Sequence, residues 1–144
     1  MDFVTENIAI GDGPESEDEE RLLSLEITHV LNVHPMKKQY KTLTYERMPW
    51  HDENDLQMLN DALNFMDHAI RAGGKIIVIC GGGVERSPLT VLAYLHRKEG
   101  LSIEEAYSVL KSKRPVCDIN LSWLDGWLES APMTPIKYRG HFWS

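Results

Sequence analysis

The segment from residue 75 to residue 90 is Lys75-Ile-Ile-Val-Ile-Cys80-Gly-Gly-Gly-Val-Glu-Arg86-Ser-Pro-Leu-Thr90. Its continuous apolar run, 75–79, is typical of a strand buried on both faces of a parallel sheet. The three glycines allow a sharp turn whose backbone N–H groups point inward, an arrangement that suits an anion. Pro88 is tolerated in a first helical turn, so we expect a helix to begin near Ser87. The segment therefore predicts a strand, an anion-binding turn and a helix in succession.

Cys80 and Arg86 indicate the chemistry of this turn. A helix N-terminus and a neighbouring arginine favour the thiolate form of a cysteine, which is its nucleophilic form. Arg86 adds a planar fork matched to phosphate oxygens. The alternative is a structural turn in which Cys80 is only a small buried hydrophobe. A Walker nucleotide loop does not fit, because Val84-Glu85-Arg86 stands where Gly-Lys-Ser/Thr is required. We therefore interpret residues 80–86 as a site for a phosphate ester.

Length and composition limit the class of protein. The 144 residues, 42% hydrophobic and 26% charged, suit one soluble domain spanning 1–144, in which 131–144 form a tail without chemistry. A net charge of −7 disfavours nucleic acid and anionic membrane surfaces as partners. No apolar run is long enough to span a membrane. Two cysteines are too few for a disulfide scaffold, and a reactive thiolate needs a reducing compartment, so we expect a cytoplasmic protein.

Apolar periodicity predicts alternating strands and helices. We expect strands within 3–11 (two short strands around a turn at Glu6-Asn7) and at 27–33, 43–48 and 75–79. We expect helices at 16–26, 55–72 and 89–98, a fourth from 102 to about 113, and a last one that Asn120 caps. Capping boxes are predicted for Ser16 with Glu19 and for Ser102 with Glu105. The faces predicted to point inward comprise Leu22, Leu23 and Leu25 in the first helix and Ile103, Ala106, Tyr107 and Leu110 in the fourth.

This alternation predicts an α/β fold, with a central, mostly parallel twisted sheet of about four to five strands and helices on both faces. In such sheets a ligand lies beyond the carboxyl ends of the strands. Cys80 follows directly after a predicted strand, and the loop that contains Asp52 follows another. Both are therefore expected at the same edge of the sheet.

The chain resembles the dual-specificity branch of the cysteine-based protein tyrosine phosphatases, as a small single-domain member. The family loop His-Cys-x2-Gly-x2-Arg-Ser is matched by Cys80, Gly83, Arg86 and Ser87. Other family landmarks occur in the family's order, at 7–11, 27–33, 49–52, 93–95, 105–107, 114–115 and Asn120. One departure is Ile79, which stands where the family has a histidine that helps to hold the loop and tune the thiolate.

The resemblance implies a cysteine-dependent phosphatase that acts on phosphorylated proteins through a phosphocysteine intermediate. Its substrates would be phosphotyrosine and also phosphoserine and phosphothreonine. In the implied mechanism Cys80 is the nucleophile and Asp52 the general acid, with Asp55 as the competing candidate for the acid. Ser87 donates a hydrogen bond to the departing thiolate, and Asn120 either supports the loop or simply caps a helix. The phosphate-binding turn comprises Gly81, Gly82, Gly83, Val84, Glu85 and Arg86.

Two alternative functions are consistent with the sequence. One is a pseudophosphatase that binds phosphoproteins without turnover, which Ile79 in place of the family histidine favours. The other is a phosphatase of a non-protein phosphate ester. The six histidines lack ligand spacing, so we predict neither metal nor cofactor. A monomer is the default expectation. Cys117 is expected to be a bystander, with a reversible disulfide to Cys80 as the alternative.

Overall fold

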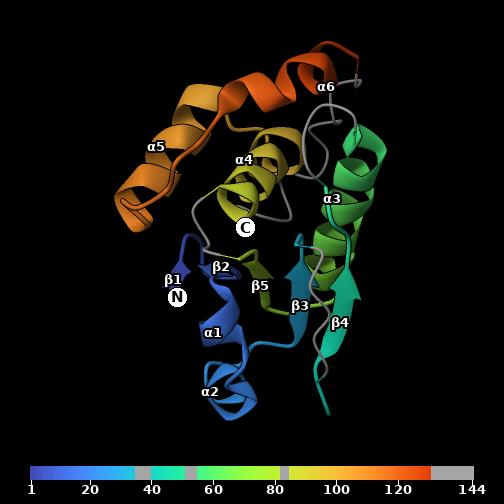
Figure 1. The fold of residues 1–144 in the computed structure, drawn as a ribbon, viewed down its shortest axis with the longest axis vertical. Coiled ribbons are helices and arrows are strands. Elements are labelled where there is room, and N and C mark those ends of the chain that lie inside the picture. The colour runs from blue at the N-terminus through green and yellow to red at the C-terminus, as the bar shows by residue number, and fades with distance from the viewer. Residues whose placement is uncertain (35–39, 51–54, 82–84, 131–144) are drawn as a thin grey trace.

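The computed structural model describes residues 1–34, 40–50, 55–81 and 85–130, and the predicted tail at 131–144 lies outside these ranges. Within them five strands form one sheet between two layers of helices (Figure 1). The strands are β1 Asp2–Phe3, β2 Ile8–Gly11, β3 His29–Asn32, β4 Thr44–Arg47 and β5 Ile76–Ile79. The helices are α1 Gly13–Ser16, α2 Glu19–Ser24, α3 Leu56–Arg71, α4 Arg86–Glu99, α5 Ile103–Lys113, the 3-10 helix η2 Leu121–Leu124 and α6 Asp125–Ser130.

The strand order is β1-β2-β5-β3-β4, and only β1 is antiparallel to its neighbour. The predicted mostly parallel sheet with helices on both faces is therefore confirmed. In the register of the sheet, Gly11 of β2 and Asn32 of β3 both lie opposite Ile79 of β5. The carboxyl ends of these three strands consequently meet at one edge, which is where the residue after β5, Cys80, begins its turn.

The side chains of β5 enter two separate cores because successive residues of a strand point to opposite faces. Ile76 and Val78 pack in the larger core, which α3, α4, α5 and α6 cover. Ile77 and Ile79 pack in the smaller core on the other face, with Leu22 of α2. All four strand residues are buried. This two-sided burial explains why the sequence is apolar at every position from 76 to 79.

Most helix boundaries agree with the sequence. Gly73, just past α3, has a φ of 85°, and Gly100, just past α4, has a φ of 77°, so both adopt the left-handed geometry that ends helices. The capping box of Ser102 and Glu105 is confirmed, with both reciprocal hydrogen bonds present. None of the helices in the described ranges is both long enough and apolar enough to cross a bilayer.

The predicted helix at 16–26 is wrong in its start, its cap and its inward face. Two short helices occupy this region, and Asp12 with Glu15 makes the capping box of the first. Asp18 caps the second, while the Glu19 carboxylate accepts hydrogen bonds from the backbone N–H groups of residues 41 and 42. Because a six-residue helix has room for one inward position, only Leu22 is fully buried, and Leu23 is 45% exposed.

Tyr107 of α5 is a second correction. We expected it in the core, yet it is 38% exposed, while Ala106 and Leu110 are fully buried. The buried positions are four residues apart, so they mark a narrow stripe along the helix. A flanking residue such as Tyr107 then lies at the border of the packed surface and keeps contact with solvent.

Candidate active site

Cys80 lies directly after β5, is 5% exposed and belongs to the larger core. Its Sγ atom is 2.9 Å from the hydroxyl oxygen of Ser87, in a buried hydrogen bond. Ser87 is fully buried in the first turn of α4. This hydrogen bond therefore joins the end of β5 to the start of α4. When Cys80 is a thiolate, the Ser87 hydroxyl is the donor of this bond.

Arg86 is the first residue of α4, and its Nε–H group is buried without a hydrogen-bond partner in the described part of the structure. A buried donor without an acceptor costs free energy, so an anion bound here would be stabilised by it. The positive end of the α4 dipole lies at the same place. Glu85, at the N-cap position, is exposed and makes no side-chain capping bond to the N-terminus of α4.

Backbone hydrogen bonds hold the start of the turn on two sides. The Val33 N–H donates to the Ile79 carbonyl at 2.9 Å, just past β3. The Gly13 N–H donates to the Gly81 carbonyl at 3.2 Å, at the start of α1. Cys80 lies between these two anchored residues. The position of Cys80 therefore depends on the residues that follow β2 and β3, the two strands beside β5.

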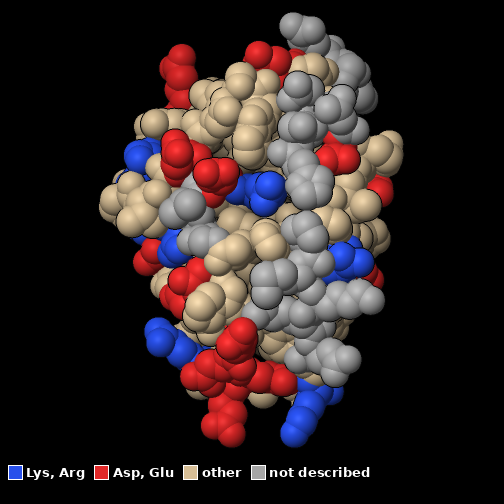
Figure 2. Space-filling view, in the orientation of Figure 1, with Lys and Arg blue, Asp and Glu red and all other residues tan. Residues whose placement is uncertain are grey.

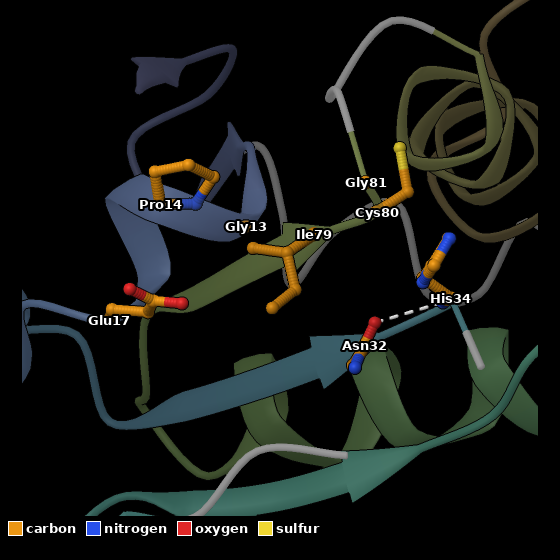
Figure 3. A pocket seen from close by; sticks show the side chains of 8 residues that line it. All are labelled: Gly13, Pro14, Glu17, Asn32, His34, Ile79, Cys80 and Gly81. Atoms are coloured by element: carbon orange, nitrogen blue, oxygen red, sulfur yellow. Dashed lines mark hydrogen bonds between the residues drawn. The ribbon is translucent and has the colours of Figure 1, made fainter. Parts of the chain in front are cut away.

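A pocket of about 230 Å³ opens beside Cys80 (Figure 3). Its lining comprises Gly13, Pro14, Glu17, Asn32, His34, Ile79, Cys80 and Gly81. The His34 ring covers Gly81, because its Cδ2 and Nε2 atoms lie 3.5 Å from the position that a Cβ on Gly81 would take. The pocket is thus walled by α1 on one side and by an imidazole on the other.

His34 is a site residue that the sequence analysis missed. Its backbone N–H donates to Asn32 Oδ1 at 2.9 Å, and Asn32 Nδ2 donates to the Tyr45 hydroxyl at 3.0 Å. These bonds orient the residues that follow β3. Ile79, in contrast, is 1% exposed and points into the smaller core, so no polar side chain comes from position 79. The sequence does contain a signal for His34. It follows directly after the predicted buried strand at 27–33, and ligands bind beyond the carboxyl ends of such strands.

The loop after β4 is anchored to α4 by Trp50. Its indole is fully buried, and Nε1–H donates to the Thr90 hydroxyl at 2.8 Å. The Thr90 hydroxyl in turn donates to the Arg86 carbonyl at 2.6 Å. Asp52 lies outside the described residues, and Asp55 is the N-cap residue of α3 without a side-chain capping bond. The choice of Asp52 over Asp55 as general acid therefore stays a prediction.

Gly82, Gly83 and Val84 lie outside the described residues. Asn120 caps η2 by accepting from the Ser122 N–H at 3.2 Å, which confirms its capping role, whereas its support of the turn stays a prediction.

Cys117 is a free, buried thiol whose pKa is raised by desolvation, and Cys80 is free as well. The expectation that Cys117 is a bystander, and its alternative of a reversible disulfide on oxidation, both stay predictions. Among the residues that the structure describes, no group of three or more His, Cys, Asp or Glu side chains is arranged to hold a metal ion.

Comparison with known proteins gives a consistent result. The family described as "Dual specificity phosphatase, catalytic domain" matches residues 10–129. Dual specificity protein phosphatase 1 of Arabidopsis thaliana is 30% identical over 130 residues, covering 85% of this chain and 64% of that protein. Dual specificity protein phosphatase 5 of Rattus norvegicus is 32% identical over 125 residues, covering 81% of this chain and 33% of that protein.

A solved structure, human DUSP28, matches with a TM-score of 0.81 and 26% identity and covers 99% of this chain and 98% of that one. The chain thus spans about two thirds or less of the curated relatives above but nearly all of this structural relative.

Proposed function

Because the chain belongs to the dual specificity phosphatase catalytic-domain family, we propose that it is a cysteine-dependent phosphatase acting on phosphotyrosine, phosphoserine and phosphothreonine in proteins. One observation carries the proposal. Cys80 is hydrogen-bonded to Ser87 at the N-terminus of α4, beside an Arg86 Nε–H that has no acceptor among the described residues. A nucleophile, a cationic donor and a helix dipole thus meet at one point, which suits a phosphate ester.

In the proposed first step the Cys80 thiolate attacks phosphorus and an S–P bond forms while the P–O bond to the substrate breaks. Arg86 and the N-terminus of α4 stabilise the charge on the phosphoryl oxygens. Asp52 protonates the departing oxygen. In the second step water attacks phosphorus, Asp52 takes its proton, the S–P bond breaks and inorganic phosphate leaves. The Ser87 hydroxyl stabilises the returning thiolate through the bond seen at 2.9 Å.

The acidic side chains near the pocket favour substrate peptides that carry basic residues next to the phosphorylated residue. Acidic side chains gather at the end of the molecule where α2 lies (Figures 1 and 2). Glu17, from the same region, is exposed and lines the pocket beside Cys80. We infer that phosphopeptides with arginine or lysine next to the phosphoresidue react about two- to fivefold faster than acidic ones, the effect expected of one exposed charge pair. Glu17→Lys should abolish this preference, and an unchanged preference would refute it.

The decisive experiment measures phosphate release from two aryl phosphates, one with a good and one with a poor leaving group. We expect Cys80→Ser to lower turnover about a thousandfold or more. Asp52→Ala should lower it by about 10²–10⁴ for the poor leaving group and much less for the good one, because only the former needs a proton. Asp55→Ala is the matched control and should retain activity. Full activity in Cys80→Ser would refute the nucleophile, and a loss confined to Asp55→Ala would move the acid.

A second candidate function is a phosphoprotein-binding module without turnover. It is favoured by Ile79, which replaces the family histidine and is buried in the smaller core. The proposal of an enzyme predicts that the wild type turns over. A wild type that binds a phosphopeptide but releases no phosphate would establish the binding module instead. We also propose a cytoplasmic location, since the thiolate requires reducing conditions.

A further inference from the structure

A second pocket, of about 370 Å³, lies at the opposite end of α4 from Arg86. It is formed by the turn between β1 and β2, the last turn of α4 and one side of α5. Its lining comprises Val4, Thr5, Glu6, Asn7, Leu95, Glu99, Leu101, Val109 and Lys113. Four of these side chains are aliphatic. The volume is within the range of roughly 300–1,000 Å³ that is usual for small-molecule sites.

Glu99 is the polar group buried in this pocket. It is the last residue of α4 and is 8% exposed, and within the described ranges its carboxylate has no hydrogen bond or ion pair. Burial removes hydration from the charged form, which raises the pKa of this carboxyl to about 7. The C-terminal end of a helix carries partial negative charge, so the α4 dipole does not stabilise the carboxylate either. Within the described residues, the ionised group therefore has no paired counter-charge.

The basic side chains nearest in sequence are engaged elsewhere. The Arg97 guanidinium stacks over the Trp127 ring at 4.2 Å from its centroid. The Lys98 ammonium donates to Asn64 Oδ1 at 3.3 Å. Lys113 is exposed at the rim of the pocket, and in the described part of the chain it makes no ion pair with Glu99. An added cation could therefore occupy the space beside Glu99.

We propose that this pocket binds a small organic cation, with a primary or secondary ammonium group on the Glu99 carboxylate and an apolar body against Val4, Leu95 and Leu101. The ammonium supplies both the missing charge and N–H donors, and a charge-assisted hydrogen bond in a poorly hydrated site is strong. Glu99 lies thirteen positions after Arg86 along α4, which is about 20 Å at 1.5 Å per residue. The site is therefore separate from the turn at Cys80, and the inference does not depend on the proposed phosphatase activity.

The test compares 2-phenylethylammonium with its neutral counterpart 2-phenylethanol, by calorimetry and by amide NMR shifts of the intact chain. We expect the wild type to bind the ammonium at least about tenfold more tightly than the alcohol, because only the ammonium meets the carboxylate charge. The amide shifts of Val4, Leu101 and Val109 should move on binding, which locates the ligand without any mutation. Equal affinity for the two probes, no binding at millimolar ammonium, or shifts confined to other residues would overturn the proposal.

Three variants separate Glu99 from its neighbours. Glu99→Gln keeps the size of the side chain and should abolish the preference for the ammonium. Glu6→Gln is the matched control, because Glu6 is an exposed glutamate of the same rim, and it should keep the preference. Lys113→Met removes a competing cation and should leave binding equal or tighter. A loss in Glu6→Gln as large as in Glu99→Gln, or an undiminished preference in Glu99→Gln, would refute the assignment.

Discussion

Replacing Glu99 with glutamine should stabilise the protein at neutral pH, although it removes a charged residue from a folded chain. The carboxylate is 8% exposed and has no ion pair in the described residues, so its charged form is favoured in the unfolded chain, where water reaches it. Glutamine is neutral at every pH and has nearly the same shape as the protonated glutamic acid. The free energy of unfolding of the two proteins should therefore be similar in acid and diverge as Glu99 ionises.

The direction and size of this divergence follow from the pKa of Glu99. It is about 7 in the folded protein, above the ordinary value of 4.5, so the folded state binds the proton more tightly than the unfolded state. The stabilising contribution is fully present below pH 4.5 and is lost as the pH rises to about 7. The difference between the two pKa values, at 1.36 kcal/mol per pKa unit, corresponds to about 3 kcal/mol. Glu99→Gln should thus be more stable than the wild type by up to about 3 kcal/mol above pH 7.5.

The assay is urea unfolding of the wild type and Glu99→Gln at several values of pH between 4.5 and 8. The difference between the two free energies of unfolding cancels the titration of all other groups. Glu6→Gln, at the exposed rim of the same pocket, is the control and should show a nearly constant difference. A constant difference between wild type and Glu99→Gln, or a variant that is less stable at pH 8 than at pH 5 relative to wild type, would refute the reasoning.

Three further predictions concern the site at Cys80. Ser87→Ala removes the hydroxyl that bonds the sulfur, so breakdown of the intermediate should slow about 10–100-fold and phosphocysteine should accumulate in rapid-quench mass spectra; a normal rate would refute this. Trp50→Phe loses the hydrogen bond to Thr90 and should lower the free energy of unfolding by about 1–3 kcal/mol. Adding Thr90→Val to this variant should lower the free energy of unfolding little further, because the bond is already lost. If the two effects are additive in urea unfolding, the residues are not coupled. His34→Ala removes one wall of the pocket and should raise KM for an aryl phosphate severalfold more than it lowers kcat; an unchanged KM would contradict that role.

Errors in the sequence analysis arose where local patterns compete. Ser16 with Glu19 matches a capping box, yet Asp12 with Glu15 matches one too, and the structure uses the latter. Glu19 instead accepts hydrogen bonds from the backbone at 41 and 42, across 22 and 23 residues of chain. No local rule could rank these options, because the preference depends on the loop that packs against α2. The exposure of Leu23 follows from the same break in the helix.

Residues within one short segment were predictable because their chemistry is local. The β-branched run at 76–79 and Pro88 in a first helical turn each favour one backbone geometry, and the structure has β5 and the start of α4 at these positions. The side chains of Cys80 and Ser87, which follow β5 and lie in the first turn of α4, are 2.9 Å apart. The parallel sheet with helices on both faces followed from the alternation of periodicities along the chain.

The sequence by itself thus determined the alternation of strands and helices and the positions of Cys80 after β5 and Arg86 at the start of α4. Only the tertiary structure decided which distant residues surround the segment between them and which groups are buried elsewhere. His34 covers Gly81, and Trp50 bonds Thr90 across 40 residues, because the strand order sets β3 beside β5 and the loop after β4 packs on α4. Glu99 is buried because the β1–β2 turn and α5 close over the end of α4. Such contacts leave no periodic signal in the chain, since each depends on the packing of elements far apart in sequence.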